Sequence, residues 1–321
     1  YMANKLLHEL KQVEFSANGT PHKVSCSVGI TLFPDHGTDL NELLANADMA
    51  MYQAKEAGSG RWHLYSPDEQ AKELLASRAK WRERIAQALI DDAFELHYQP
   101  IFDIRQQCVT RFETLVRMRD NAGRLVFPDN FIPIAEHSGQ IHEIDRWVIR
   151  KAIQRVSEHR GLSLSVNLSG RVLDDPSLLE WFHNELQESG IEPAQLVVEI
   201  TETAAVANVQ DAITFMREIK ALGCRFALDD FGSGFSSFAY LKQLPVDIVK
   251  IDGAFIQHLP TSAEDQLFVK ALTDVAKGLG KTTIAEFVED AETLRLLEDF
   301  GVDFAQGYHI GRPSPMMTGI H

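Results

Sequence analysis

The sequence has few cysteines and no long apolar run. Three cysteines (Cys26, Cys108 and Cys224) occur in 321 residues, and none belongs to a Cys-x-x-Cys pair. This usage fits a reduced cytoplasmic compartment better than a secreted disulfide framework. No apolar run reaches the roughly 18 residues of a membrane span, and no signal peptide is visible. We therefore expect a cytoplasmic domain, whose parent protein is free to carry a membrane anchor elsewhere.

Basic residues are outnumbered by acidic ones. Lysine and arginine total 31 against 46 aspartate and glutamate residues, which gives a formal net charge of −15. Such a surface repels nucleic-acid polymers and anionic membranes, so we expect no nucleic-acid polymer as a partner. An anionic substrate would need a local reversal of this field, most simply by divalent cations. The apolar share of 45% is typical of a globular protein with a buried core.

The first 92 residues predict a small α/β piece (residues 1–66) and a connecting helix (residues 67–92). The small piece shows a helical pattern near 3–13, an alternating strand near 24–32, a helix over 41–57 and a strand near 62–65. The connecting helix is rich in Ala, Glu, Lys and Arg, and Pro67 and Asp68 suit its start. Whether it transmits a signal or is only a spacer is open at this point.

Over residues 93–321, short apolar strands alternate with amphipathic helices. Strands are predicted over 94–103, 109–117, 162–168, 196–201, 225–229, 247–251, 283–288 and 304–310, and helices near 143–159, 177–187, 209–222, 236–243, 263–279 and 291–300. A short polar turn joins the first two strands, which we expect to pair antiparallel, and the remainder predicts a parallel sheet. We predict an α/β fold, a (β/α)8 TIM-like barrel with one antiparallel strand. An open doubly wound sheet is the alternative, but no Gly-x-Gly-x-x-Gly turn supports a dinucleotide site.

Two adjacent carboxylates, Asp229 and Asp230, follow the apolar residues 226–228 and precede a Gly-Ser-Gly turn. A buried carboxylate costs several kcal/mol unless it is paired or holds a cation. Taken alone, the two aspartates could equally cap the next helix. A kinase role for the Asp-Phe-Gly sequence is excluded, because no Val-Ala-Ile-Lys or His-Arg-Asp motif accompanies it.

Polar side chains also recur at the ends of the other predicted strands. The full set is Glu113, Asn167, Glu199, Asp229, Asp230, Lys250, Glu286 and Gln306. In a (β/α)8 barrel the C-terminal strand ends converge on one mouth, where active sites are found. Any one of these residues could be a paired core residue, but the whole set is hard to explain as structure. Carboxylate and amide oxygens without histidine or cysteine suit Mg²⁺ or Mn²⁺ rather than zinc.

Five acidic groups are too many for one buried dication, and two ions sharing Asp229 and Asp230 balance the charge better. Two such ions can activate a water and stabilise the oxyanions of an in-line displacement at phosphorus. Lys250 then orients the water, deprotonates it or neutralises developing charge, and the sequence does not separate these roles. Arg117, four residues after Glu113 on the same strand face, suits a phosphate oxygen.

From about residue 78 to its end, the chain resembles the EAL family of phosphodiesterases, which hydrolyse cyclic dimeric GMP (cyclic di-GMP). The motifs that carry the resemblance stand in order at 98–100, 113–117, 165–169, 199–202, 229–234, 250–252, 285–289 and 306–308. Four residues depart from the family pattern: Thr114 replaces Ala, Met118 replaces the frequent Trp, Ser233 replaces Thr, and Phe287 stands where the family often has Gly. None of them removes an expected ligand.

The resemblance implies a role for each motif residue. One metal ion would be held by Glu113, Asn167, Glu199 and Asp229, and the second by Asp229, Asp230 and Glu286. Lys250 would act on the attacking water, and Glu202 would tether the loop that follows Asp230. Substrate contacts are implied for Gln99, Leu115, Arg117, Glu289, Gln306 and Tyr308, with Glu289 and Tyr308 near a guanine.

Residues 27–30 and 44–55 resemble the C-terminal half of a GGDEF (diguanylate cyclase) domain. The catalytic hairpin of that family lies upstream of this segment and is not in the sequence. Residues 1–66 are therefore not expected to be a cyclase on their own, and we interpret them as a structural remnant or a hinge.

These patterns together lead to the hypothesis of a metal-dependent phosphodiesterase that opens cyclic di-GMP to linear pGpG with two Mg²⁺ or Mn²⁺ ions. The alternatives are a non-catalytic cyclic di-GMP receptor and a dimerisation or signalling scaffold. Family resemblance also leads us to expect a homodimer through the barrel and an upstream sensor domain in the parent protein.

Overall fold

The computed structural model describes residues 3–7, 15–17, 20–22, 26–56, 61–159, 161–232 and 238–318. The chain divides into two compact units, residues 1–81 and 82–321. The helix α3 (Pro67–Ile90) runs across this division. The domain limits at residues 66 and 92 stay predictions.

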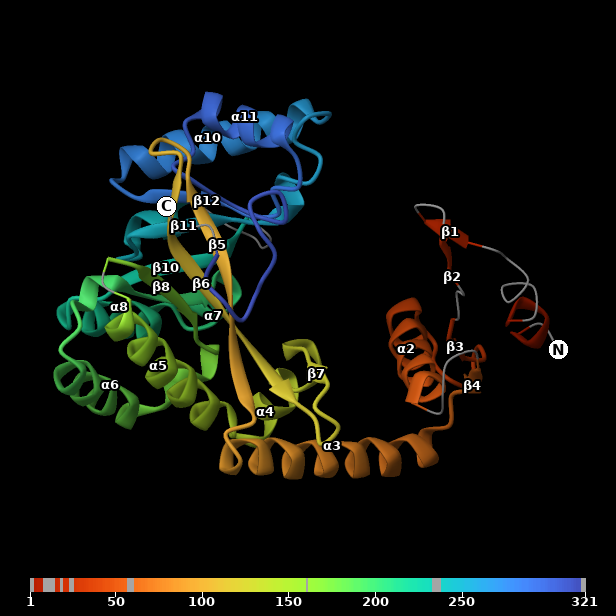
Figure 1. The fold of residues 1–321 in the computed structure, drawn as a ribbon. Helices are drawn as coiled ribbons and strands as arrows, with labels where there is room; N and C mark the ends of the chain where they lie inside the picture. Colours follow the sequence, from red (N-terminus) through yellow and green to blue (C-terminus); the bar gives the residue numbers. More distant parts are fainter. Residues whose placement is uncertain are drawn as a thin grey trace. The chain divides into compact units, whose positions relative to one another are not determined.

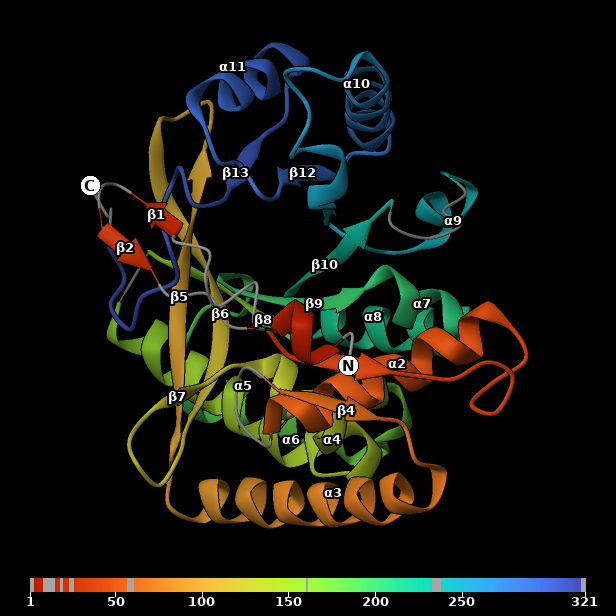
Figure 2. The same cartoon turned by 90° about the vertical axis from the view of Figure 1, so that its right-hand side faces the viewer.

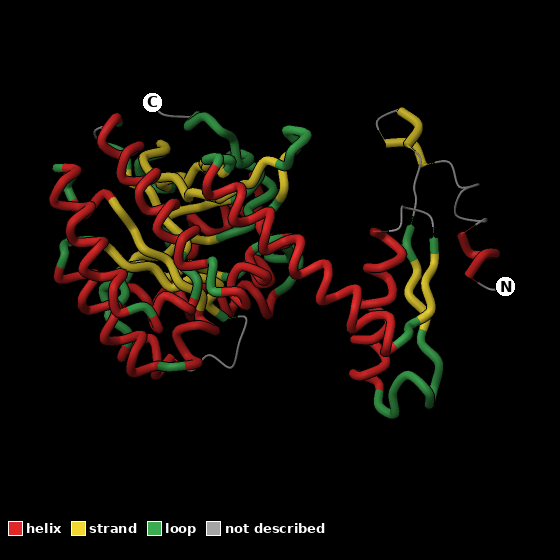
Figure 3. The backbone as a smooth tube through the Cα atoms, turned by 90° about the horizontal axis from the view of Figure 1, so that it is seen from below, coloured by secondary structure: helices red, strands yellow, loops and turns green. Residues whose placement is uncertain are grey.

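The first unit contains short strands and one long helix. The strands β1 (Phe15–Ala17) and β2 (Thr20–His22) pair antiparallel, and β3 (Val28–Ile30) and β4 (Trp62–Leu64) pair parallel. In the sequence, α2 (Leu40–Glu56) connects β3 to β4, and it packs against both strands (Figure 3). Gly29 permits this packing, because a Cβ there would overlap the Ala47 carbonyl. Residues 3–7 are helical as predicted, and residues 8–13 of that predicted helix lie outside the described residues.

Eight strands of the second unit form a closed barrel with helices on its outside (Figures 1 and 3). The strands are β5 (Phe94–Asp103), β6 (Cys108–Arg119), β8 (Ser163–Asn167), β9 (Leu196–Thr201), β10 (Arg225–Phe231), β11 (Ile248–Ile251), β12 (Thr282–Ala285) and β13 (Phe304–Gln306). β5 runs antiparallel to both its neighbours, β6 and β13, while the other pairs in the barrel are parallel. The predicted barrel with one antiparallel strand is therefore confirmed. Figure 2 shows the long β5–β6 hairpin that closes it.

The connecting elements follow the helical patterns of the sequence. The longer helices are α5 (Ile141–Glu158), α6 (Pro176–Ser189), α8 (Val209–Ala221), α10 (Ala263–Gly278) and α11 (Ala291–Phe300). The shorter elements are β7 (Leu125–Val126), η1 (Pro128–Asn130), α4 (Ile132–Ser138), η2 (Gly170–Asp174), η3 (Pro193–Gln195), α7 (Glu202–Ala207), α9 (Phe238–Gln243) and η4 (Gly253–Phe255). Local sequence sets several starts: the Ser262 and Asp290 side chains cap α10 and α11 by accepting backbone N–H groups.

Two predicted strands are shorter than expected. β12 ends at Ala285 instead of residue 288, and β13 ends at Gln306 instead of residue 310. Phe287 has a φ of 54°, a left-handed conformation that is incompatible with a continuing strand. The residues after each strand instead exchange isolated hydrogen bonds, such as Val288 N–H to the Gln306 carbonyl. Glu286 therefore stands just after a strand.

The barrel interior is apolar at its centre. A buried cluster joins one inward-facing residue from each of six strands: Ile101, Val197, Ala227, Ile248, Ile284 and Phe304. Because side chains alternate along a strand, the polar residues two positions before or after this layer face the two ends of the barrel. The layer thus separates the two ends.

Candidate active site

Glu113 makes polar contacts to several other predicted site residues. Its Oε1 accepts a hydrogen bond from Asn167 Nδ2 (2.6 Å), and its Oε2 accepts one from Gln306 Nε2 (2.5 Å). Glu113 lies in the middle of β6, as it does in the strand predicted over 109–117, rather than at the strand's end. The strand β6 pairs with β8 only as far as Thr114 and then continues as a hairpin with β5. Glu113 therefore lies where β6 leaves the barrel wall.

Lys250 lies at the centre of four carboxylates. Its Nζ is 2.8 Å from Glu286 Oε1, and the remaining distances are 3.0 Å to Glu199 Oε2, 3.0 Å to Asp229 Oδ1 and 3.2 Å to Glu113 Oε2. Lys250 is fully buried, and burial alone would lower its pKa. The surrounding carboxylates, Asp229 first among them, outweigh burial and raise the pKa of Lys250 well above its ordinary value. The side chain is therefore an ammonium ion.

One ammonium does not compensate this much negative charge. Burial, reinforced by neighbouring carboxylates, raises the pKa of Glu286 to about 8, of Glu199 to about 7 and of Asp230 to about 6. Glu113 is different: burial would raise its pKa, but Lys250 and the hydrogen bonds from Gln306 and Asn167 hold it below the ordinary value. The site therefore favours additional positive charge.

The carboxylates form two overlapping groups whose oxygen atoms lie within 4.8 Å of one another. The first group is Glu113, Glu199 and Asp229, and the second is Asp229, Asp230 and Glu286. Neighbouring side chains of a regular strand face opposite ways, but Asp230 has a φ of 55°. This left-handed turn lets both aspartates contribute to one site. Asp229 belongs to both groups.

Glu199 has the least satisfied carboxylate of the set. It is fully buried, and the donors close to its oxygens among the described residues are the Lys250 ammonium, 3.0 Å away, and the Ser165 hydroxyl, which does not reach good hydrogen-bond geometry. Buried carboxylate oxygens without donors are costly unless a cation satisfies them. The donor set of carboxylates with one amide, lacking histidine and cysteine, fits a hard divalent cation.

Glu202 contacts the segment that follows Asp230. Its buried Oε2 accepts a hydrogen bond from the Gly232 backbone N–H at 2.9 Å. Glu202 is the first residue of α7, a short helix that the sequence analysis did not predict. Residues 233–237, with Ser233 among them, lie outside the described residues.

The expected substrate residues differ in their position. Gln99 joins the cluster, because its Oε1 accepts a hydrogen bond from Gln306 Nε2 at 3.2 Å. Arg117 is buried, and its Nε has no hydrogen-bond partner among the described residues. Leu115 is half-buried and Glu289 is exposed, and no polar contact of either residue to the cluster is described.

The sequence analysis did not single out two further residues that lie near these positions. Phe127 is half exposed, and the Arg117 guanidinium lies 5.0 Å from the centre of its ring. Arg312 lies 4.4 Å from the ring centre of Tyr308, which is also half exposed. The only sequence signals were an aromatic residue before a proline and an arginine after the last strand.

A departure from the family pattern is accommodated on the outside of the barrel wall. Thr114 donates a hydrogen bond from Oγ1 to the Ser165 carbonyl at 2.6 Å and is buried. It lies on the strand face opposite to Glu113, as strand alternation predicts.

Comparison with known proteins identifies the family. The model of the EAL domain matches residues 82–313, and that of the diguanylate cyclase GGDEF domain matches residues 2–61. The chain belongs to the EAL domain family. Both resemblances seen in the sequence are thereby confirmed.

Relatives of this EAL chain include named phosphodiesterases. The chain is 40% identical over 304 residues to the cyclic di-GMP phosphodiesterase PdeB of Shewanella oneidensis. This alignment covers 92% of this chain and 35% of PdeB. It is 34% identical to the cyclic di-GMP phosphodiesterase PdeR of Escherichia coli, with 99% of this chain and 48% of PdeR covered. The chain thus spans between a third and a half of these curated relatives.

Solved structures show the same fold. The EAL domain of FimX from Pseudomonas aeruginosa, in complex with cyclic di-GMP, matches with a TM-score of 0.72 and 33% identity over 74% of this chain and 98% of that chain. Within the described residues, no helix has the length and apolar character needed to cross a membrane.

Proposed function

We propose that this EAL domain hydrolyses cyclic di-GMP to the linear dinucleotide pGpG in a reaction that requires two divalent cations. Its relatives PdeB and PdeR are named cyclic di-GMP phosphodiesterases, and the FimX EAL domain was solved with that nucleotide bound.

The observation that carries the proposal is the pair of carboxylate groups that share Asp229. Five carboxylates and one ammonium leave a formal charge of four negative units, which is the charge that two divalent cations neutralise. We propose Glu113, Asn167, Glu199 and Asp229 as ligands of one ion, and Asp229, Asp230 and Glu286 as ligands of the other. In the present structure the Asn167 Nδ2 group donates a hydrogen bond to Glu113. To bind the ion, the Asn167 amide must therefore rotate so that its oxygen faces the metal.

The divalent cations, when bound, supply Lewis-acid stabilisation of the phosphate oxygens and favour ionisation of a water. Water attacks phosphorus, the bond from phosphorus to one 3′ oxygen breaks, and a proton is delivered to that leaving oxygen. Lys250, charged and fully buried among the ligands, orients the water and neutralises developing charge.

The substrate is held by polar groups around the carboxylates. Gln99 and Gln306 lie against Glu113 and can donate to phosphate or ribose oxygens, and Arg117 suits a phosphate oxygen. The half-exposed ring of Tyr308 offers a stacking surface for a guanine, with Leu115 and Glu289 as further contacts. Glu202 positions the segment after Asp230 through Gly232.

Incubation of the chain with cyclic di-GMP and Mg²⁺ or Mn²⁺ tests the proposal, with pGpG measured by chromatography. We expect pGpG to form with metal and not with chelator, and Glu113→Ala to abolish turnover. No turnover by the intact chain with either metal would contradict the proposal. The same assay with each ion alone decides between Mg²⁺ and Mn²⁺.

A non-catalytic receptor is the second candidate, and Phe287 is the observation that favours it. This residue follows Glu286 directly, has a left-handed backbone and is about half exposed. Its ring packs on the backbone of Gly253, next to the barrel mouth. Binding of cyclic di-GMP without hydrolysis, unaffected by Glu113→Ala, would favour a receptor; turnover gained by Phe287→Gly would show that the ring blocks catalysis. No binding at all would point to a scaffold.

We further propose that the domain works in the cytoplasm, as a homodimer through the barrel, under the control of an upstream sensor domain in the parent protein. Sedimentation analysis of the chain with and without cyclic di-GMP tests the dimer.

A further inference from the structure

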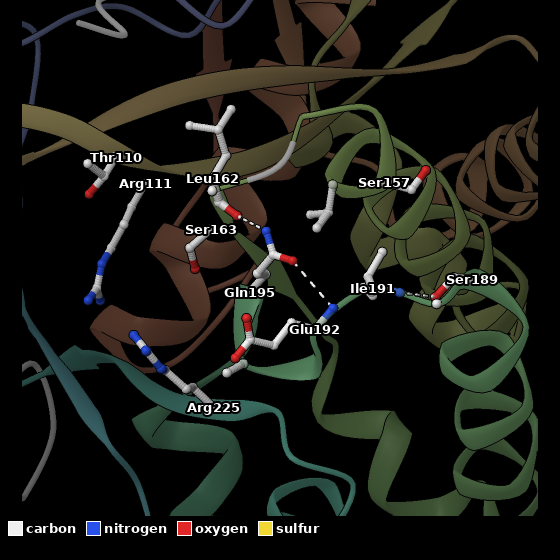
Figure 4. A pocket seen from close by; sticks show the side chains of 14 residues that line it. Thr110, Arg111, Ser157, Leu162, Ser163, Ser189, Ile191, Glu192, Gln195 and Arg225 are labelled. Carbon is white, nitrogen blue, oxygen red and sulfur yellow. Dashed lines mark hydrogen bonds between the residues drawn. The ribbon is translucent and has the colours of Figure 1, made fainter.

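A polar pocket lies at the N-terminal end of the barrel, opposite to the carboxylate cluster. It has a volume of about 560 Å³ and is lined by the starts of β6, β8 and β10 together with η3 (Figure 4). The ends of α5 and α6 complete it with Ser157 and Ser189. The N-terminal end of such a barrel ordinarily serves stability, so a polar pocket there needs an explanation.

Two arginines face this pocket from different strands. Arg111 precedes Glu113 by two residues on β6, and Arg225 precedes Asp229 by four residues on β10. Each arginine therefore shares the inward strand face of a cluster residue, and both line the pocket at the N-terminal end. Four residues of strand separate Arg225 from Asp229 by roughly 13 Å. Figure 4 shows the two guanidinium groups converging on the same side of the pocket.

Neither arginine has an ion pair or a hydrogen bond among the residues that the structure describes. Arg111 is half-buried over the ring of Phe304, with 4.2 Å from its guanidinium carbon to the ring centre. Burial and the charge of Arg225 lower the pKa of Arg111, and Asp103 and Asp303 offset only part of this effect. Two like charges held together in this way are unfavourable without an anion.

The pocket also contains an unused hydroxyl group. Ser163 Oγ is buried and has no hydrogen-bond partner among the described residues. The Ser157 and Ser189 hydroxyls donate to helix carbonyls, and Gln195 donates to the Leu162 carbonyl. Glu192 is exposed and points toward the arginines, but it lies outside ion-pair distance of both. The side-chain donors of the pocket that have no described partner thus include two guanidinium groups and the Ser163 hydroxyl.

We propose that this pocket binds a small phosphate-bearing anion, with Arg111 and Arg225 as its charged ligands and Ser163 Oγ as a hydrogen-bond donor. Guanidinium groups bind phosphate oxygens in pairs of parallel hydrogen bonds. The volume exceeds what inorganic phosphate needs and lies in the range of small-ligand sites. The anion is either free phosphate or the phosphate group of a mononucleotide. The site is independent of the proposed phosphodiesterase activity.

The test is calorimetric titration of the metal-free 321-residue chain. Without metal the carboxylate cluster repels anions, so binding reports on the polar pocket. The probes are inorganic phosphate, adenosine 5′-monophosphate and adenosine. We expect one saturable site for phosphate and for the nucleotide, and none for adenosine. Tighter binding of the nucleotide identifies a nucleotide site, and equal affinities identify a phosphate site.

Variants locate the binding. Arg225→Gln and Arg111→Gln should each weaken phosphate at least about tenfold, because each removes one charged ligand. Glu192→Gln should strengthen binding, since it removes the only carboxylate that lines the pocket in the described chain. Arg295→Gln, the same charge change on the exposed surface of α11, is the matched control and should have no effect. Circular dichroism checks folding, and Glu192→Gln gives the opposite sign even if an arginine variant does not fold.

Three results would overturn the proposal. The first is the absence of saturable phosphate binding by the intact chain. The second is an affinity that Arg225→Gln and Arg111→Gln leave unchanged while both remain folded. The third is equal binding of adenosine and its monophosphate, which would show that phosphate is not recognised.

Discussion

The two ends of the barrel carry opposite charge on the same strands. β6 contributes Arg111 to one end and Glu113 to the other, and β10 contributes Arg225 and Asp229 in the same way. On β10 the buried apolar layer separates the two residues through Ala227, whereas on β6 Arg111 and Glu113 are successive inward-facing residues. The contrast shows that the net charge of −15 does not decide what this protein binds. The inward-facing positions of individual strands do: one end is suited to cations and the other to anions.

The largest effect is expected from Asp229→Asn, which removes the charge that both carboxylate groups share. Turnover of cyclic di-GMP should fall at least about a hundredfold, and both ions should bind more weakly. Glu286→Gln should weaken only one ion. Asp274→Asn, on the exposed surface of α10, is the matched control. Equal effects of the first two variants on both ions would contradict the shared role of Asp229.

Lys250→Met should increase the charge difference between the two ends of the barrel, because it makes the end with the carboxylate cluster more negative. At pH 8 the metal-free chain should lose about 3 kcal/mol of unfolding free energy, because buried carboxylates lose their counter-charge. Urea denaturation with and without Mn²⁺ measures this loss, and Mn²⁺ should restore most of it. The control is Lys270→Met, whose side chain is exposed. An unchanged metal-free stability would show that Lys250 does not compensate the cluster.

Low pH should reduce the charge difference between the two ends of the barrel, because the carboxylate cluster takes up protons. The pKa values of Glu199 (about 7) and Glu286 (about 8) are raised, so the folded metal-free chain holds protons that the unfolded chain releases. Its stability should therefore fall as pH rises toward 8. A divalent cation must displace the same protons, so its affinity should rise at least about tenfold from pH 6 to pH 8.5. Mn²⁺ titration across this range checks the sign, and a flat profile would contradict it.

The smallest effect is expected from Glu202→Ala, which removes the acceptor for the Gly232 N–H. Turnover should fall by about tenfold, as for other residues that orient ligands, and metal affinity should change less. Glu202→Gln keeps an acceptor oxygen and should recover part of the activity. Unchanged turnover and metal affinity in Glu202→Ala would contradict the proposed positioning of the segment after Asp230 by Glu202. The proposed metal site would not be affected by that result.

The barrel could be predicted because its strands and helices have different hydrophobic periods. The cluster followed from it, since Asn167, Glu199 and Lys250 all lie within or at the ends of short apolar strands. The metal ligands came from residue type as well as from place. The family resemblance, carried by motifs in the right order, added the roles of Gln99 and Glu202.

Other features depend on contacts that no pattern in the sequence shows. The position of Glu113 where β6 leaves the barrel wall is one such feature, because the pairing of β6 with β8 stops at Thr114 while its pairing with β5 continues. The early end of β12 follows from the left-handed backbone of Phe287. The proximity of Arg111 and Arg225 could not be predicted either, because 113 residues separate two positions that meet only when the barrel closes.

The most direct test of the account is turnover of cyclic di-GMP measured against the number of Mn²⁺ ions bound per chain. Metal-free protein is titrated with Mn²⁺, and bound ions and pGpG are measured in the same samples. The account predicts no product without metal and full turnover only when two ions are bound. Full turnover with chelator present, or with a single bound ion, would contradict it.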